Sequence, residues 1–261
     1  MGKKRPSHRR GAIHRGRGKL DVDVTTLADT WRRQEHSGKG LIGGDPQRKP
    51  FWKHPQPPEP AAWYRHGMAS PAHQQRLHEF LTRAPLEIEI GSGDGRFIIA
   101  WAEQHPDRHF FAFEVRWKYA RRMFERAQKR GLGNLWVSDN DARIVIPDVV
   151  PDNSVEVFHI LMPDPWWKPK HQAKRVIAPW FVQVLGRKLK PGGILRVETD
   201  VEGYPEFVDT VVAESGNALA PHNPALGERF AQAPLTTRQL WCQTHHVPVY
   251  RRYYQKSTGE E

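Results

Sequence analysis

Cysteine is almost absent from this sequence of 261 residues, with Cys242 as its single example. One cysteine excludes an intramolecular disulfide and any multi-cysteine zinc site, so no metal centre is expected and a reducing compartment suits the chain. No apolar run reaches the roughly 18 residues that a membrane span needs, and the basic N-terminus leads into mixed polar sequence, without an apolar signal core. These absences favour a cytoplasmic protein without a membrane anchor.

Acidic residues are missing from the first 19 positions, which hold eight Lys and Arg. The formal net charge of +11 is uneven, because residues 1–60 carry 14 Lys and Arg against 6 Asp and Glu, an excess of 8 that leaves only about 3 for the remainder. Such a composition predicts disorder over residues 1–19. Two explanations stay open: a solubilising tail, or an electrostatic arm for a polyanion.

The chain divides into two parts by composition. Residues 27–33 are expected to form a short helix, and residues 38–60, with four glycines and six prolines, are typical of an extended linker. We therefore expect a basic, largely disordered extension over residues 1–60 and a folded domain over residues 61–261.

Within the expected domain, strand patterns alternate with segments at helical spacing, which predicts a parallel sheet with helical crossovers. We expect a doubly wound, Rossmann-like α/β sheet, mostly parallel with an antiparallel edge strand. The expected strands are Leu86–Ile90, His109–Val115, Asn134–Ser138, Val155–Met162, Ile194–Thr199 and an edge strand Val247–Tyr254, and the expected helices are Arg96–Gln104, Trp117–Arg130, Ala178–Leu189, which the turn 190–193 follows, and Tyr204–Ser215.

A glycine-rich turn lies where the first expected strand meets the first helix, the place where doubly wound sheets bind ligands. Gly91 and Gly93 permit positive φ and close approach of a ligand to the backbone. The spacing Gly-x-Gly-x-Gly differs from the dinucleotide fingerprint, and acids surround it. Glu89 and Asp94 would repel a pyrophosphate, whereas they would attract the sulfonium and ammonium of S-adenosyl-L-methionine.

Two further acids follow the next strands of the expected sheet. Glu114 ends the second strand, where a carboxylate can accept hydrogen bonds from both ribose hydroxyls. Asp141 follows the third strand and is placed to meet the adenine amino group, although an Asp in such a position is more often a helix cap. Acids at three consecutive strand ends are hard to explain as caps together, so they favour a nucleoside cofactor.

The fourth strand ends in a stiff loop, Pro163-Asp164-Pro165-Trp166. Two prolines fix the backbone around Asp164, whose carboxylate can accept hydrogen bonds from the N1 and N2 groups of guanine and leave N7 free. A turn with its Trp packed in the core is the alternative. The residues that follow favour contact with a polynucleotide, since phosphates and bases call for cations beside aromatic faces: Lys168, Lys170, His171, Lys174 and Arg175.

The loop motif, with Lys168, His171, Lys174 and Arg175, resembles the tRNA (guanine-N7-)-methyltransferase family, and the resemblance covers roughly residues 85–254. It implies that S-adenosyl-L-methionine is bound by Glu89, Glu114 and Asp141, with Asp164 against it, and the glycine turn adds Gly91 and Gly93 to the expected cofactor-binding residues. It implies that Asp164 lies in the active site against the cofactor, with guanosine 46 of the tRNA variable loop as the target. Substrate contacts are implied for Lys168 and Asp200, and His171 and Arg175, in the basic run behind the loop, are expected to contact the substrate as well.

One segment departs from the family pattern. The family carries a C-terminal Thr-x-x-Glu that contacts the substrate, and this chain offers Thr236 or Thr237 for the Thr but Gln239 or Leu240 in place of the Glu. Gln239 could keep a hydrogen bond without the charge, whereas Leu240 could not. Thr236, Thr237 and Gln239 are therefore included among the expected substrate-binding residues.

The sequence as a whole predicts an enzyme that methylates N7 of a guanine in tRNA, as a monomer or a homodimer. Since N7 carries a lone pair and no proton, methyl transfer needs alignment and no general base. Two alternatives stay open. One is an S-adenosyl-L-methionine-dependent enzyme for another substrate, and the other is a non-catalytic RNA-binding relative.

Overall fold

The computed structural model of the chain describes residues 62–258, apart from residues 68, 217 and 218 and the side chains of residues 169 and 170. The extension predicted over residues 1–60, with its short helix and linker, lies outside the described residues.

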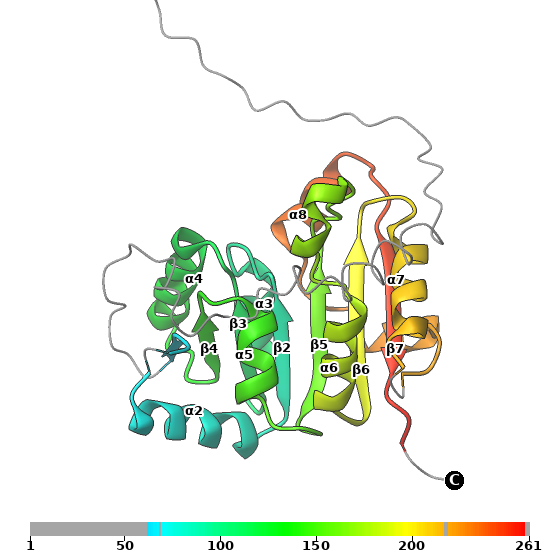
Figure 1. The fold of residues 1–261 in the computed structure, drawn as a ribbon. Helices are drawn as coiled ribbons and strands as arrows, with labels where there is room; N and C mark the ends of the chain where they lie inside the picture. Colours follow the sequence, from blue (N-terminus) through cyan, green and yellow to red (C-terminus); the bar gives the residue numbers. More distant parts are fainter. Residues whose placement is uncertain (1–61, 68, 217–218, 259–261) are drawn as a thin grey trace, which may run out of the picture.

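A seven-stranded sheet runs through the centre of the molecule (Figure 1), in the order β1-β4-β3-β2-β5-β6-β7. Every neighbouring pair is parallel except β6 and β7. The prediction of a mostly parallel sheet with an antiparallel edge strand is confirmed. The strands are β1 (Trp63–Tyr64), β2 (Leu86–Ile90), β3 (His109–Phe113), β4 (Leu135–Ser138), β5 (Val155–Leu161), β6 (Leu189–Thr199) and β7 (Tyr250–Gln255).

Helices cover both faces of the sheet, because alternate side chains of the buried strands point to opposite sides and each side needs an apolar cover. One face packs against α2 (Pro71–Arg83), α5 (Ala142–Val149), α6 (Pro179–Lys188) and α7 (Tyr204–Glu214). The other face packs against α3 (Arg96–Gln104), α4 (Trp117–Lys129) and the 3-10 helix η2 (Pro224–Phe230). The remaining elements are the 3-10 helix η1 (Pro169–Lys174) and α8 (Thr237–Thr244).

Strand β6 differs from the sequence prediction, because it begins at Leu189 and runs through the segment expected to form a turn. Leu189 pairs with Val155, and a register shift between Val155 and Val157 absorbs the irregularity. Hydrogen bonds across to Gln255 and Lys256 hold the glycines of this segment in the sheet. Sheet pairing therefore overrides the turn propensity of residues 190–193.

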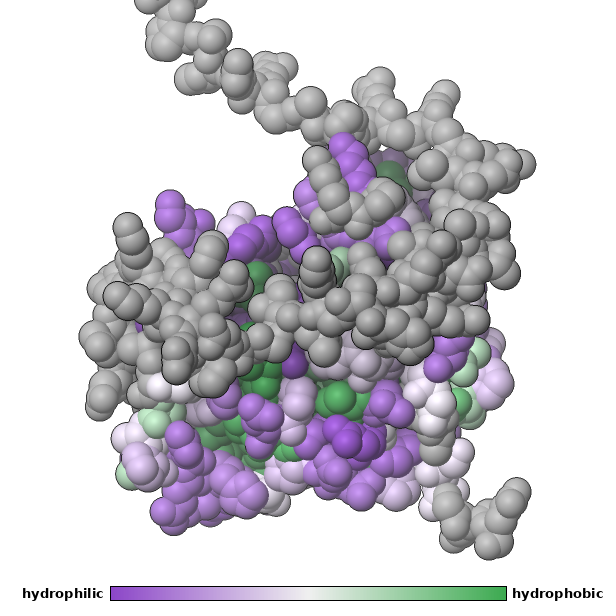
Figure 2. All heavy atoms as spheres, viewed as in Figure 1, coloured by the Kyte–Doolittle hydropathy of each residue, from purple (hydrophilic) through white to green (hydrophobic). Residues whose placement is uncertain are grey.

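Helix α8 lies above the edge of the sheet where the parallel strands end (Figure 1). Hydrophilic residues dominate this upper rim of the molecule near the tops of α4 and α8 (Figure 2). The carboxyl ends of β2, β3, β4, β5 and β6 all open onto this rim, so the acids and loops that follow those strands are gathered along one line.

Candidate cofactor and base-binding site

The glycine turn after β2 uses its glycines for two different reasons. Gly91 and Gly93 have φ of 83° and 56°, and a side chain at either position would meet nothing within 4 Å. Gly95 has φ of 75°, but a Cβ there would come within 2.4 Å of the Met123 side chain. Gly91 and Gly93 thus leave open space in which a ligand can approach the backbone, whereas Gly95 lets α3 pack on α4.

Glu114 holds this turn in place. Its carboxylate accepts hydrogen bonds from the backbone N–H of Gly93 at 2.9 Å and of Arg116 at 2.9 Å, and the Arg116 side chain pairs with it at 2.9 Å. Glu114 is 4% exposed. The residue predicted to bind ribose therefore also fixes the shape of the turn beside which a ribose would lie.

Glu89 lies deeper, 1% exposed, and its Oε2 has no hydrogen-bond partner. Burial raises the pKa of Glu89 to about 8, against the smaller opposing effects of Ser92 and Arg196. A buried carboxyl oxygen without a donor is costly and marks a place where a cationic ligand group would be stabilised. This observation fits the ammonium of S-adenosyl-L-methionine.

Asp141 caps α5, as its position after a strand allowed. It accepts a hydrogen bond from the backbone N–H of Arg143 at 2.9 Å, and the Arg143 guanidinium pairs with it at 2.6 Å. The adjacent Asp139 is 1% exposed and forms an ion pair with Arg65 at 2.5 Å. The sequence analysis missed this pair, although the run Asp139-Asn140-Asp141 was a signal that one of its acids is structural.

The loop after β5 is strained on both sides of Asp164. Met162 has φ of 56° and Trp166 has φ of 44°, a region that residues other than glycine seldom adopt. The backbone N–H of Met162 is bound to the Glu198 carbonyl at 2.7 Å, which continues the pairing of β5 with β6 to the base of the loop. Such strain persists only where the surroundings fix the conformation, and it is concentrated at functional sites.

Arg175 holds this loop in its strained conformation. Its guanidinium donates to the carbonyls of Pro165 at 2.9 Å and Trp166 at 3.2 Å, and it packs over the rings of Trp167 and Phe207. Arg175 is 1% exposed, and two of its three guanidinium nitrogens are occupied by these carbonyls. The sequence analysis expected Arg175 to bind substrate, and its buried position instead makes it a support of the Asp164 loop.

Asp164 itself is exposed and accepts no hydrogen bond from the residues that the structure describes. Trp166 lies beside it on the loop, with Lys174 4.9 Å above its ring and His171 at its edge, 5.3 Å between ring centroids. Lys168 is exposed at the start of η1. The described residues thus bring together an exposed carboxylate, an aromatic ring and cations on one loop.

Three consecutive residues in the first turn of α8 form hydrogen bonds with the glycine turn and with the end of β6. Thr237 donates to Asp94 in the glycine turn at 3.0 Å. Arg238 binds Asp200, the residue after β6, with Nε at 2.9 Å and Nη2 at 2.5 Å from one carboxylate oxygen. Gln239 donates to Glu198 at 2.6 Å. Asp200 was predicted at this edge, whereas Arg238 and Glu198 were not. The signal for Glu198 was the charged pair that it forms with Arg196 in the otherwise apolar strand β6.

Gln239 also explains the departure from Thr-x-x-Glu. The Thr236 side chain accepts the Gln239 N–H at 3.1 Å and the Gln239 side chain accepts the Thr236 N–H at 2.8 Å, a capping box that Gln and Glu can both complete. A Glu at this position would oppose the buried carboxylate of Glu198 at the distance of a hydrogen bond. Because Gln239 is 3% exposed, its position suits a structural role and not the substrate contact expected of it.

The open glycine turn, the acids at three neighbouring strand ends and the unpartnered Glu89 oxygen fit a nucleoside cofactor with a positively charged tail. A doubly wound sheet that carries this set at its carboxyl edge defines a class, the S-adenosyl-L-methionine-dependent methyltransferases.

The chain belongs to the family described as "Putative methyltransferase" (Methyltransf_4), whose model matches residues 83–246. A protein of Myxococcus xanthus named tRNA (guanine-N(7)-)-methyltransferase is 45% identical over 124 residues, which cover 48% of this chain and 60% of that protein. A protein of the same name from Chromohalobacter salexigens is 33% identical over 178 residues, which cover 67% of this chain and 72% of that protein. The chain thus spans about three fifths of the length of the first of these relatives.

Among solved structures, the 16S rRNA methyltransferase KamB is 20% identical, and the match covers 72% of this chain and 94% of that chain, with a TM-score of 0.48.

Within residues 62–258, apart from the undescribed positions, no helix is long and apolar enough to cross a membrane.

Proposed function

We propose that this protein transfers a methyl group from S-adenosyl-L-methionine to N7 of a guanine in tRNA, and that it does so in the cytoplasm. The two relatives named for this activity support the choice of tRNA and of N7. Guanosine 46 of the variable loop, which the resemblance of the loop motif implies, is part of the proposal.

The observation that carries the proposal is the position of Asp164. It is an exposed carboxylate without a hydrogen bond among the described residues, held on a strained loop next to the acid-lined cofactor site. A carboxylate kept free on a fixed loop is available to two adjacent N–H donors, and the N1 and N2 groups of guanine present such a pair. Guanine held by this edge leaves N7, on the opposite edge of the base, free to react.

The chemistry needs orientation more than proton transfer. When bound, S-adenosyl-L-methionine supplies an electrophilic methyl group on a sulfonium sulfur. Asp164 fixes the plane and direction of the guanine ring, and its negative charge opposes the positive charge that develops on the ring as N7 is alkylated. Trp166 offers an aromatic face beside the base, and Lys168 and Lys174 face the flanking phosphates.

The direct test is methyl transfer to unmodified tRNA. Purified protein, labelled S-adenosyl-L-methionine and an unmodified tRNA transcript should yield labelled N7-methylguanosine after digestion to nucleosides. A matched transcript with guanosine 46 replaced by adenosine should yield none.

The rival functions predict other outcomes. Cofactor binding without label in tRNA would favour an enzyme for another substrate. RNA binding without affinity for S-adenosyl-L-methionine would favour a non-catalytic relative, and label at another guanine would contradict only the assignment to position 46.

A further inference from the structure

Three ionisable side chains form one row across the sheet beneath the glycine turn. Glu89 on β2 is in register with His159 on β5, which is in register with Arg196 on β6. In-register residues of parallel strands point to the same face, so the three side chains are neighbours on the side covered by α3 and η2. They are 1%, 0% and 3% exposed.

Each member of the row leaves one polar atom unpaired. Glu89 Oε2, His159 Nδ1 and Arg196 Nη1 are all buried and without a hydrogen-bond partner. Buried polar atoms are nearly always paired, and each exception calls for an explanation. These three atoms lie on adjacent strands and on one face of the sheet, so we consider them together.

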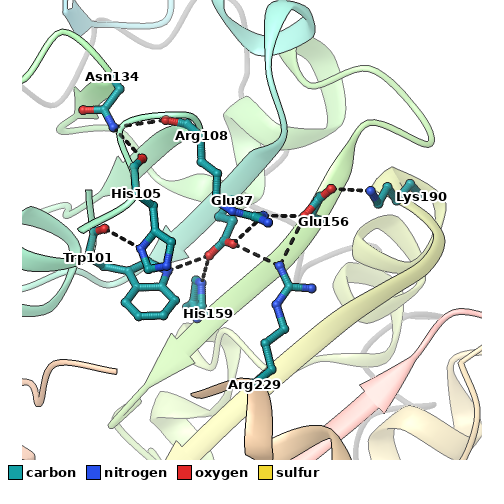
Figure 3. A network of polar contacts seen from close by, with 9 residues as sticks. All are labelled: Glu87, Trp101, His105, Arg108, Asn134, Glu156, His159, Lys190 and Arg229. Carbon is teal, nitrogen blue, oxygen red and sulfur yellow. Dashed lines mark hydrogen bonds and ion pairs between the residues drawn. The ribbon is translucent and has the colours of Figure 1, made fainter. Parts of the chain in front are cut away.

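The other ring nitrogen of His159 is fixed by a buried carboxylate. His159 Nε2 lies 2.9 Å from the Glu87 carboxylate. The same carboxylate accepts hydrogen bonds from the side chains of Trp101, Arg108 and Arg229 (Figure 3). This network holds the pKa of Glu87 low, at about 2, so Glu87 is a permanent anion that keeps the His159 Nε2 proton in place.

Arg196 is fixed in a similar way. Its Nε and Nη2 bind one oxygen of Glu198 at 2.7 and 2.6 Å. Phe97 and Phe230 lie against its guanidinium, at 5.3 and 4.6 Å, and both rings also contact His159. The unpaired Nη1 therefore belongs to a guanidinium that is 3% exposed and packed against two aromatic rings.

We infer that Arg196 is a cofactor-positioning residue, whose charge acts along the row to let Glu89 ionise when a ligand presents its ammonium group. The inference rests on the proposed use of S-adenosyl-L-methionine. Without a counter-charge, burial would keep Glu89 protonated, and a neutral carboxyl attracts an ammonium weakly. Arg196 supplies the counter-charge from two strands away.

Among the charged groups around Glu89, Arg196 is the cation that favours its ionisation. Glu114 after β3 and Asp94 in the glycine turn carry like charges and disfavour its ionisation, whereas the Ser92 hydroxyl and Arg196 favour it. His159 is kept neutral because burial lowers its pKa. Glu87, on the same strand, is an anion and cannot supply a counter-charge. Arg196 is thus the opposing charge among these groups.

The test is the pH dependence of binding of S-adenosylhomocysteine, measured by calorimetry between pH 6 and 9. This ligand carries the ammonium but a neutral sulfur, so its own amine titrates at higher pH than that of the sulfonium cofactor. Wild-type affinity should rise with pH as Glu89 ionises. Arg196→Met should move the midpoint upward by about one pH unit, which weakens binding about tenfold near pH 7.

Glu198→Gln should move the midpoint in the opposite direction, since it releases Arg196 from its present partner without changing the size of the side chain. The double variant should return toward the wild-type profile, because both charges are then gone. Opposite shifts from adjacent substitutions cannot come from general destabilisation. If Arg196→Met fails to fold, Glu198→Gln and the charge-keeping Arg196→Lys carry the test.

Two controls isolate the ammonium. 5′-Methylthioadenosine lacks the amino acid end, so its binding should be insensitive both to pH and to Arg196→Met. Arg251→Met removes a 51% exposed guanidinium that pairs with the same Glu198 at 3.4 Å, and it should shift the midpoint little.

Failure of the inference and failure of the proposed function are distinguishable. No binding of S-adenosylhomocysteine by the wild type would contradict the proposed cofactor. Binding with the same pH midpoint in wild type, Arg196→Met and Glu198→Gln would overturn the role of Arg196 and leave the cofactor intact.

Discussion

The two halves of the rim of strand ends differ in how their acids are held. On the cofactor side, Glu89 and Glu114 are 1% and 4% exposed, and Glu114 is bound to the backbone of the turn that it supports. On the base-binding side, Asp164 is exposed and accepts no hydrogen bond among the described residues, and Asp200, whose side chain is 12% exposed, is paired with an Arg238 side chain that is 50% exposed.

This difference indicates that the cofactor side is formed before any ligand arrives, whereas the base-binding side is completed by its substrate. The Arg238 side chain is half exposed, so its guanidinium can turn from Asp200 toward a phosphate at the surface. Buried and backbone-bound acids cannot rearrange in this way. Substitutions on the two sides should therefore separate folding and cofactor binding from methyl transfer.

The largest effect on stability is expected from Gly95→Ala. The new methyl group would overlap the fully buried Met123 and would also force φ of 75° on an alanine, at a cost of about 2 to 4 kcal/mol. Gly93→Ala meets no atom within 4 Å and should cost about 1 kcal/mol, but it fills the space of the ligand. Urea unfolding measures the stability of each variant, and cofactor titration measures its affinity. An equal loss of stability in both variants would contradict the packing role of Gly95 and the ligand-space role of Gly93.

Glu89→Gln should stabilise the protein at high pH while abolishing tight cofactor binding. Burial raises the pKa of Glu89 from 4.5 to about 8, so folding retains a proton that the unfolded chain has lost, and stability falls as pH rises through this window. The variant lacks that titration. Without cofactor it should match the wild type near pH 5 and exceed it by about 2 to 4 kcal/mol at pH 8. A parallel pH profile for the two proteins would show that Glu89 is ionised without ligand.

Arg175→Met should weaken the loop that carries Asp164. It leaves the Pro165 and Trp166 carbonyls without their donor, which should cost about 2 to 3 kcal/mol and lower methyl transfer more than cofactor affinity. Lys174→Met, at an exposed position over Trp166, is the control and should cost less than about 1 kcal/mol. An Arg175 variant of unchanged stability, with a shallower salt dependence of RNA binding, would restore the phosphate contact first expected of this residue.

Gln239→Glu should have the smallest effect. It preserves the capping box but sets a carboxylate against Glu198, so we expect a loss of about 1 to 2 kcal/mol at pH 8 that shrinks at pH 5 as one carboxyl takes up a proton. Combination with Glu198→Gln should restore stability. If the single variant were as stable as the wild type and more active, Gln239 would be a weakened substrate contact after all.

The sequence predicted what depends on local pattern. Strand alternation predicted the parallel sheet and its antiparallel edge, and strand-end acids predicted which side chains share the rim. It could not predict how those acids are partnered, since the pairs Arg65–Asp139 and Arg238–Asp200 join residues whose meeting depends on sheet register and on the path of α8. Arg175 shows the same limit, because a cation in a basic run cannot be assigned to the surface or to the interior before the loop is folded.

The most direct measurement is the effect of Asp164→Asn on two quantities, the dissociation constant for S-adenosylhomocysteine and the rate of methyl transfer to unmodified tRNA under saturating cofactor. If the base-binding side is completed only by substrate, the dissociation constant should change less than about threefold while the rate falls about a hundredfold or more. Equal losses in both quantities would place Asp164 in the cofactor site and contradict the separation of the two sides.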